Sequence, residues 1–351
     1  MRRVSRIAAA GVATAALAVS ATACGGTSSD AAGSKSDGKG KGVAIAYDVG
    51  GKGDQSFNDA ATAGMDKAAK DLKVGKKAVE PTDGESDADK AQRLTELAKQ
   101  GYNPVIGIGY AYAPAVKEVA AKFPKVSFGI VDDATIEADN VSDLVFNEEQ
   151  SSYLAGVAAA KATKSKTVGF IGGVNNPLIR KFEAGFVQGV KATDKSVKVK
   201  RQMLTEKAED GGFSSPDKGK EGASGQIEGG ADVVYHAAGL SGQGVIEAAA
   251  AKKVWAIGVD SDQYKQKALA KYKKYILTSA TKDVAGAVYN LTKSVQDGNA
   301  KGGVVRADLA SGGVALADSN PEFVKMKDLQ AAVEKAEADI KSGKIKVKTT
   351  L

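Results

Sequence analysis

The chain has 351 residues, a formal net charge of +7, one cysteine, one histidine and an apolar content typical of a globular protein. This mild charge does not indicate a nucleic-acid partner, and the lysines between Lys341 and Lys348 lack interspersed aromatic residues on which bases stack. A single cysteine excludes a disulfide within the chain, and the single histidine leaves few groups for catalysis or metal binding.

The first 23 residues have the layout of an export signal. Three arginines within the first six residues precede an uncharged run of small residues that ends at Ala23. This run is shorter and poorer in leucine and isoleucine than a membrane span, so we expect a cleaved signal peptide over 1–23. Loss of the three arginines would leave a net charge of +4.

The only cysteine, Cys24, follows this run directly. A lone cysteine is more often a small buried residue than a functional one, but Cys24 precedes a segment that cannot pack. Its position resembles a bacterial lipobox, in which the cysteine is lipidated, although Ala21 stands where leucine is commoner. Residues 24–42 are almost wholly small or polar, which predicts a flexible tether. We therefore expect a lipid anchor at Cys24 on the outer face of the cell membrane.

The remaining residues, about 310 from Val43 onward, exceed what one hydrophobic core usually holds. We expect an N-terminal lobe over 43–145, completed by part of 283–351, and a C-terminal lobe over 146–282 with a return crossing near 300–320. Short β-branched runs alternate with helical stretches, which predicts parallel sheets with helical crossovers. The predicted strands are 43–48, 77–80, 104–109, 126–131, 167–171, 197–203, 232–236, 254–259 and 275–279. The predicted helices are 58–73, 86–100, 113–122, 176–192, 241–252 and 284–297, with a first interlobe crossing within 140–150.

Several predicted strands end at a polar residue or a glycine. Asp48 and Asp132 end strands in the first half, and Gly239 and Asp260 follow strands in the second. One such aspartate is usually a helix cap or a turn residue, but repetition in both halves points to a ligand, because open α/β sheets bind ligands beyond the carboxyl ends of their strands. Two facing lobes would then enclose a small polar molecule.

The loop after the first strand reads DVGGKGDQSFND and leads into a helix that begins near Asn58. Phe57 is therefore displayed at the start of that helix, either as a hydrophobic staple over the first turn or as a platform for a ligand. The glycines do not match a phosphate loop, because Gly53 stands where serine or threonine would be needed.

Six stretches together resemble the basic membrane lipoprotein family of ABC-transporter substrate-binding proteins, whose members include purine nucleoside receptor lipoproteins. The stretches are DVGGKGDQSFND, SYLAGVAAA, VGFIGG, AAGLSGQGVIEAA, IGVDSDQY and TSATKD, in family order between Val43 and Asn290. The resemblance implies an α/β, two-lobed type I periplasmic-binding-protein fold. Each lobe is a largely parallel sheet flanked by helices, with the ligand cleft between lobes that close by a hinge.

The resemblance also implies the ligand contacts. Phe57 and Phe213 would hold a flat purine base between their rings. The polar contacts would fall on Asp48, Asn58, Asp132, Gly239, Asp260 and Lys282. Asp260 and Lys282 suit ribose hydroxyls, because a carboxylate only accepts hydrogen bonds and an ammonium only donates them.

Each of these residues also has a structural interpretation without a ligand. Phe213 could be a packed loop residue and Lys282 a surface lysine. Asn58 could be an N-cap, and Gly239 could supply a positive φ.

We thus expect a monomeric lipoprotein, without cofactor, metal or nucleic-acid partner, that captures a nucleoside, of the purine class, and delivers it to the permease and ATPase subunits of an ABC importer. One alternative is a lipid-anchored sensor that binds a sugar-like or other small molecule without transport. A hydrolase acting on nucleosides is disfavoured, since HExxH, GxSxG and Walker patterns are absent from the sequence and we interpret His236 as a core or strand-end histidine. Asp132-Asp133 and Asp260-Ser261-Asp262 could bind a divalent cation, but they suit sugar hydroxyls equally well.

Overall fold

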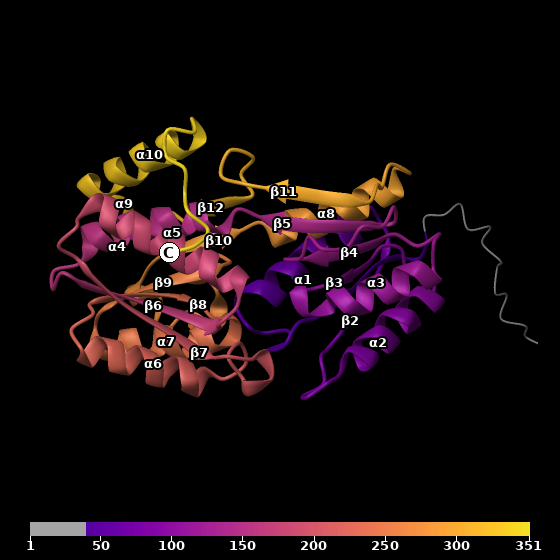
Figure 1. The fold of residues 1–351 in the computed structure, drawn as a ribbon, viewed down its shortest axis with the longest axis horizontal. Coiled ribbons are helices and arrows are strands. Elements are labelled where there is room, and N and C mark those ends of the chain that lie inside the picture. The colour runs from indigo at the N-terminus through magenta and orange to yellow at the C-terminus, as the bar shows by residue number, and fades with distance from the viewer. Residues whose placement is uncertain (1–39) are drawn as a thin grey trace, which may run out of the picture. The chain divides into compact units, whose positions relative to one another are not determined.

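A computed structural model describes residues 40–351, so the predicted signal peptide, Cys24 and most of the predicted tether lie outside the described residues. The described chain forms two six-stranded sheets flanked by helices (Figure 1). None of the helices within residues 40–351 has the length and apolar composition needed to cross a bilayer.

The first sheet is entirely parallel, with the order β11-β5-β4-β3-β1-β2. Its strands are β1 (Gly42–Ala46), β2 (Gly75–Val79), β3 (Val105–Gly107), β4 (Phe128–Val131), β5 (Val141–Phe146) and β11 (Gly303–Ala307). The second sheet has the order β12-β10-β9-β8-β6-β7 and is parallel except for β12, which runs antiparallel to β10. Its strands are β6 (Thr167–Val174), β7 (Lys198–Thr205), β8 (Val233–Ala237), β9 (Trp255–Asp260), β10 (Ile276–Lys282) and β12 (Val314–Leu316). We call the two sheets with their helices lobe 1 and lobe 2.

Helices cover both faces of each sheet, which explains why the central strands are nearly continuous apolar runs. In lobe 1, α1 (Phe57–Asp71) and α8 (Val284–Gln296) pack together on one face, and α2 (Asp87–Lys99) and α3 (Ala113–Lys122) on the other. In lobe 2, α4 (Glu148–Ala162) and α5 (Pro177–Thr193) cover one face, and α6 (Pro216–Glu228) and α7 (Gly242–Lys252) the other. Near the C-terminus, α9 (Pro321–Lys325) is followed by α10 (Lys327–Lys341), which packs on α4. Short 3-10 turns are η1 (Tyr110–Tyr112), η2 (Ala208–Asp210), η3 (Gly239–Ser241), η4 (Gln263–Lys265), η5 (Lys267–Leu269) and η6 (Lys273–Tyr275).

The two sheets repeat one topology. Strands β1 to β5 and β6 to β10 each follow the doubly wound order 2-1-3-4-5, and the chain passes between the sheets after β5, after β10 and between β11 and β12. In such a sheet the crevice for a ligand opens where the strand order reverses, here beside β1 and β3 in lobe 1 and beside β6 and β8 in lobe 2.

All nine predicted strands and all six predicted helices are confirmed, with ends that shift by a few residues. The first crossing, predicted within 140–150, follows β5, and that strand was not predicted because the buried Asp143 interrupts its apolar pattern. Helix α4 was missed because it is buried all round and has no polar face. Helix α6 was missed because it contains Gly219, Gly222 and Gly225. The C-terminal elements β11, β12, α9 and α10 were not predicted either.

Two glycines of α6 give a matched test of the packing between α6 and α7. A Cβ at Gly219 would lie 1.9 Å from the carbonyl oxygen of Ser241, whereas a Cβ at Gly225 would meet no atom within 4 Å. We expect Gly219→Ala to destabilise the protein by about 1–3 kcal/mol. Gly225→Ala should stabilise it by about 0.5–1 kcal/mol, because alanine is the better helix former. Urea unfolding of both variants measures the difference, and equal effects would contradict the close contact.

Candidate functional site

One cavity lies at the carboxyl ends of the strands of both sheets. The structure brings all eight predicted ligand residues to its wall: Asp48, Phe57, Asn58, Asp132, Phe213, Gly239, Asp260 and Lys282. The first four come from lobe 1 and the other four from lobe 2. A cavity with apolar walls and a few convergent polar groups has the properties of a small-molecule site.

The lobe 1 wall is organised by a carboxylate that the sequence did not single out. Asp54 is almost fully buried, and its two oxygens accept the backbone N–H groups of Ser56, Asn58 and Asp59. These N–H groups would otherwise be unpaired at the start of α1. The Asn58 side chain in turn donates to Asp54 and accepts the N–H of Asp48 at 3.0 Å, so it links helix α1 to the end of β1.

The N-cap interpretation of Asn58 was wrong, because the residue before the first helical position is Ser56 and Asn58 lies inside α1. The staple interpretation of Phe57 was wrong as well. A staple uses the residue that precedes the N-cap, which is Gln55, whereas Phe57 is the first residue of the helix and lines the cavity.

Phe213 lines the cavity from lobe 2, in the loop before α6. Its ring packs on the end of β6, where a Cβ at Gly173 would lie 2.4 Å from Phe213 Cδ1. Gly173 belongs to the VGFIGG stretch, so that glycine leaves the space this ring occupies. Gly239 has a φ of +51°, so the expected positive φ is confirmed, and this residue also lines the cavity.

The polar end of the cavity is built around Lys282, which is 4% exposed and therefore not a surface lysine. Its Nζ lies 2.6 Å from Asp132 Oδ2 across the cleft and 3.7 Å from Asp260 Oδ1. Lys282 therefore pairs with a carboxylate on each lobe, and the shorter ion pair is with Asp132. The ammonium also lies 4.6 Å from the centre of the Phe57 ring, within cation–π range.

Burial governs the protonation of these groups. It raises the pKa of Asp48 to about 7, and the nearby charge of Asp132 adds to this effect. Burial also raises the pKa of Asp54 to about 6 and that of Asp260, although Lys282 opposes the latter shift. For Lys282, burial lowers the pKa, but Asp132, Asp260 and Glu148 outweigh it and the net shift is upward, so the ammonium stays charged.

Three non-glycine residues with positive φ lie at the cavity or beside it: Gln55 (φ 58), Asp132 (φ 70) and Asp260 (φ 60). Such backbone costs free energy and persists only where the surroundings hold it, and it concentrates at functional sites. Asp132 and Asp260 thus owe the direction of their carboxylates to strained backbone at two strand ends.

His236 is completely buried, with its Nε2 3.0 Å from Gln263 Oε1, which agrees with a core histidine at the end of a strand. Burial lowers the pKa of His236 to about 4, so the ring is neutral at pH 7. Among residues 40–351 there is no group of three or more histidine, cysteine or acidic side chains arranged to hold a metal ion.

The cavity is also lined by residues that the sequence did not indicate, among them Asp54, Tyr110 and Phe182. Asp54 lies within the recognised DVGGKGDQSFND stretch, where its spacing from Ser56 could have marked it as a cap. Tyr110 follows β3, the strand next to β1, and its position at a strand end was an available signal. Phe182 is one of many apolar residues on α5, and nothing in the local sequence distinguishes it.

Residues 41–350 match the family model for PnrA-like ABC transporter substrate-binding proteins, named Bmp. The chain belongs to the Bmp family. It is 37% identical to the ABC transporter nucleoside-binding protein BmpA of Lactococcus lactis over 87% of this chain and 88% of that protein. It is 36% identical to the CD4+ T-cell-stimulating antigen of Listeria innocua over 95% and 98% of the two chains.

A solved structure of an ABC transporter solute-binding protein from Aeropyrum pernix superposes with a TM-score of 0.75 at 28% identity, covering 88% of this chain and 93% of that one. Together with the two parallel-dominated sheets, this similarity confirms the type I periplasmic-binding-protein fold. The chain is therefore an ABC transporter substrate-binding protein of the Bmp family.

The buried Glu148, at the start of α4, gives a pH test. Burial raises its pKa from 4.5 to about 7, with Asp132 adding to the shift and Lys282 and Lys181 opposing it. The folded state binds this proton more tightly than the unfolded state, so stability falls as pH rises from about 4.5 to about 7. We expect Glu148→Gln to stabilise the protein at pH 7.5 by about 2 kcal/mol and to have no such effect at pH 4.5.

Thermal unfolding of wild type and Glu148→Gln across this pH range measures the difference. Glu118→Gln, on the exposed surface of α3, is the matched control and should show no comparable pH-dependent gain. A Glu148→Gln protein whose stability parallels that of wild type at every pH would contradict the buried, proton-binding carboxyl.

Proposed function

We propose that this substrate-binding protein captures a nucleoside of the purine class in the cavity and delivers it to the permease of an ABC importer. The observation that carries the proposal is the polar end of the cavity. Asp132 Oδ1 is buried without a hydrogen-bond partner, while the other oxygen of the same carboxylate is held by Lys282. A buried acceptor left unpaired is costly, so this oxygen favours a ligand that donates a hydrogen bond, as a ribose hydroxyl does.

The aromatic and aliphatic lining of the cavity favours a flat apolar group. Phe57 from lobe 1 and Phe213 from lobe 2 both line it, together with Leu178, Ile179 and Phe182 of α5. Aromatic faces stack on planar rings, and a purine base joined to a ribose combines such a ring with hydroxyl donors. The nucleoside-binding relative, BmpA of Lactococcus lactis, agrees with this chemistry.

In the proposed cycle the two lobes, 43–145 with part of 283–351 and 146–282, move about the three crossings as a hinge. Closure over the ligand would create the surface that the permease recognises. Cys24, at the end of the predicted signal peptide, would carry the lipid that holds the protein at the outer face of the membrane. Metabolic labelling with a radioactive fatty acid, lost in a Cys24→Ala protein, tests this anchor.

Thermal unfolding of residues 40–351 against a panel of ligands tests the proposal directly. A ligand that binds only the folded state stabilises it by about 2.7 kcal/mol at a hundredfold excess over Kd. We expect guanosine, inosine or adenosine to raise Tm and ribose alone to leave it unchanged. A rise in Tm with sugars or another class of ligand, and none with any nucleoside, would contradict a nucleoside ligand. Turnover of a panel member would support an enzyme.

Removing either aromatic ring tests the stacking role. We expect Phe57→Ala and Phe213→Ala each to weaken nucleoside binding by about 1–3 kcal/mol, the range measured for stacking of a base on an aromatic side chain. Isothermal titration calorimetry gives the affinities. Phe123→Ala is the control, because Phe123 is a partly buried residue at the end of α3 that packs against the core of lobe 1 and does not line the cavity. That change should lower stability without changing affinity.

A further inference from the structure

The lobes are joined across the cleft by hydrogen bonds from residues that do not line the cavity. Gln263 Nε2 donates to the carbonyl oxygen of Gln55 at 3.1 Å, and Ser261 Oγ donates to that of Ser56 at 2.8 Å. Gln243 Nε2 donates to the carbonyl oxygen of Gly53 at 2.9 Å. All three donors belong to lobe 2, and all three acceptors are backbone groups of the loop 53–56 that precedes α1.

The side chain of Gln263 is fixed on its own lobe before it reaches across the cleft. It is completely buried, and its Oε1 accepts the backbone N–H of Val259 at 3.2 Å and lies 3.0 Å from His236 Nε2. An amide oxygen only accepts hydrogen bonds, so the proton of the neutral imidazole lies on Nε2. These two bonds direct the amide NH₂ of Gln263 toward lobe 1.

Glycines provide the space for this arrangement. A Cβ at Gly242 would lie 2.0 Å from His236 Cε1, and a Cβ at Gly258 would lie 2.4 Å from Gln263 Oε1. The acceptor loop is held as well, because Asp59 accepts the backbone N–H groups of Gly53 and Gln55. Donor and acceptor are therefore both preorganised, which reduces the entropy lost when the lobes meet.

We propose that Gln263, oriented by His236, is a positioning residue that latches lobe 2 onto the loop 53–56 and so sets the open–closed equilibrium of the cleft. Only the ligand used to measure release rests on the proposed function, because the latch itself consists of hydrogen bonds between protein groups. Ser261 and Gln243 extend the same latch toward the rim. A hydrogen bond made only in the closed state shifts the equilibrium toward closure and slows release of whatever the cleft holds.

The sharpest variant is Gln263→Glu. The carboxylate keeps an oxygen for His236 and Val259, but it replaces the NH₂ donor by an oxygen that faces the carbonyl oxygen of Gln55. The matched control is Gln226→Glu, since Gln226 is also buried and donates its Nε2 to a backbone carbonyl, that of Phe170, within lobe 2. The control removes the same kind of bond without touching the contact between lobes.

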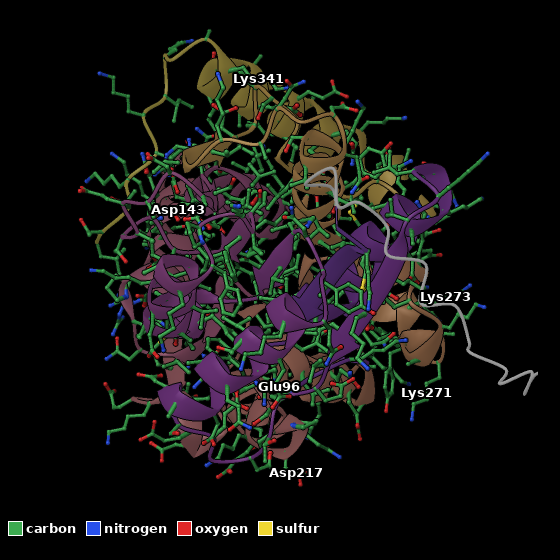
Figure 2. The ribbon with its side chains drawn as sticks, turned by 90° about the vertical axis from the view of Figure 1, so that its right-hand side faces the viewer. Glu96, Asp143, Asp217, Lys271, Lys273 and Lys341 are labelled. Atoms are coloured by element: carbon green, nitrogen blue, oxygen red, sulfur yellow. The ribbon has the colours of Figure 1, made fainter. Side chains whose placement is uncertain are left out.

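Opening is measured by electron paramagnetic resonance distances between spin labels on the two lobes. Residues 40–351 contain no cysteine, so Glu96→Cys on α2 and Asp217→Cys on α6 can be labelled selectively. Both side chains lie at the protein surface (Figure 2). Without any ligand, we expect Gln263→Glu to shift the distances toward the longer, open population and Gln226→Glu to leave them as in wild type.

Release is measured by stopped flow with guanosine. We expect guanosine to dissociate about tenfold faster from Gln263→Glu than from wild type, with an association rate within about threefold, because interface changes act mostly on dissociation. If guanosine does not bind the wild type, the proposal of a purine nucleoside ligand is contradicted, but the distances between the spin labels still test the latch. Distances and dissociation rates equal to those of wild type, or an equal opening in Gln226→Glu, would overturn it.

If Gln263→Glu does not fold, the double variant Ser261→Ala and Gln243→Ala replaces it, since both side chains are only partly buried. It removes two donors to the loop 53–56 and leaves the His236–Gln263 contact intact. A shift toward open distances supports the latch, and an unchanged distribution overturns it.

Discussion

The ion pair between Lys282 and Asp132 is the constraint on which the cleft depends. Lys282 carries the only basic side chain among the described residues that line the cavity, and it is almost completely buried. A buried ammonium without a partner is strongly unfavourable, and its closest partner lies on the other lobe, 2.6 Å away. The polar end of the cavity is therefore electrostatically complete only when the lobes are together.

The loop before α1 makes that approach possible. Gly50, Gly51 and Gly53 all have positive φ, so the chain can turn from the end of β1 to the start of α1 within a few residues. The carboxylates of Asp54 and Asp59 then hold the turn by accepting its backbone N–H groups. This stabilises a surface of carbonyl oxygens that face lobe 2, beside the residues that face the cavity.

The sequence predicted which residues meet at the cavity wall better than it predicted the contacts among them. Strand ends can be recognised in the sequence because an aspartate often follows an apolar run. Parallel strands bring such ends to one edge of a sheet, as they do Asp48 and Asp132 in lobe 1. The partners of those residues could not be predicted from the sequence. Lys282 lies closest to Asp132, which is 150 residues away in the chain, because of how the two sheets face each other. Helix α4 and strand β5 were missed because burial on all sides, or a buried Asp143, removes the periodicity from which elements are inferred.

The cleft divides its polar groups between two tasks. The amide of Gln263 has its oxygen and its NH₂ engaged by protein groups, whereas the carboxylate of Asp132 has one oxygen bound to Lys282 and the other buried without a partner. A group whose hydrogen bonds are all made to protein can stabilise closure but cannot select a ligand. A buried group with an unpaired atom can select a ligand, because any molecule that leaves the atom unpaired binds less favourably. The unpaired oxygen belongs to a carboxylate that lies with two more, Asp48 and Asp260, in the lining of the cavity. The proposed ligand should therefore donate hydrogen bonds from neutral hydroxyls, because a phosphate ester would add negative charge to a buried acidic site.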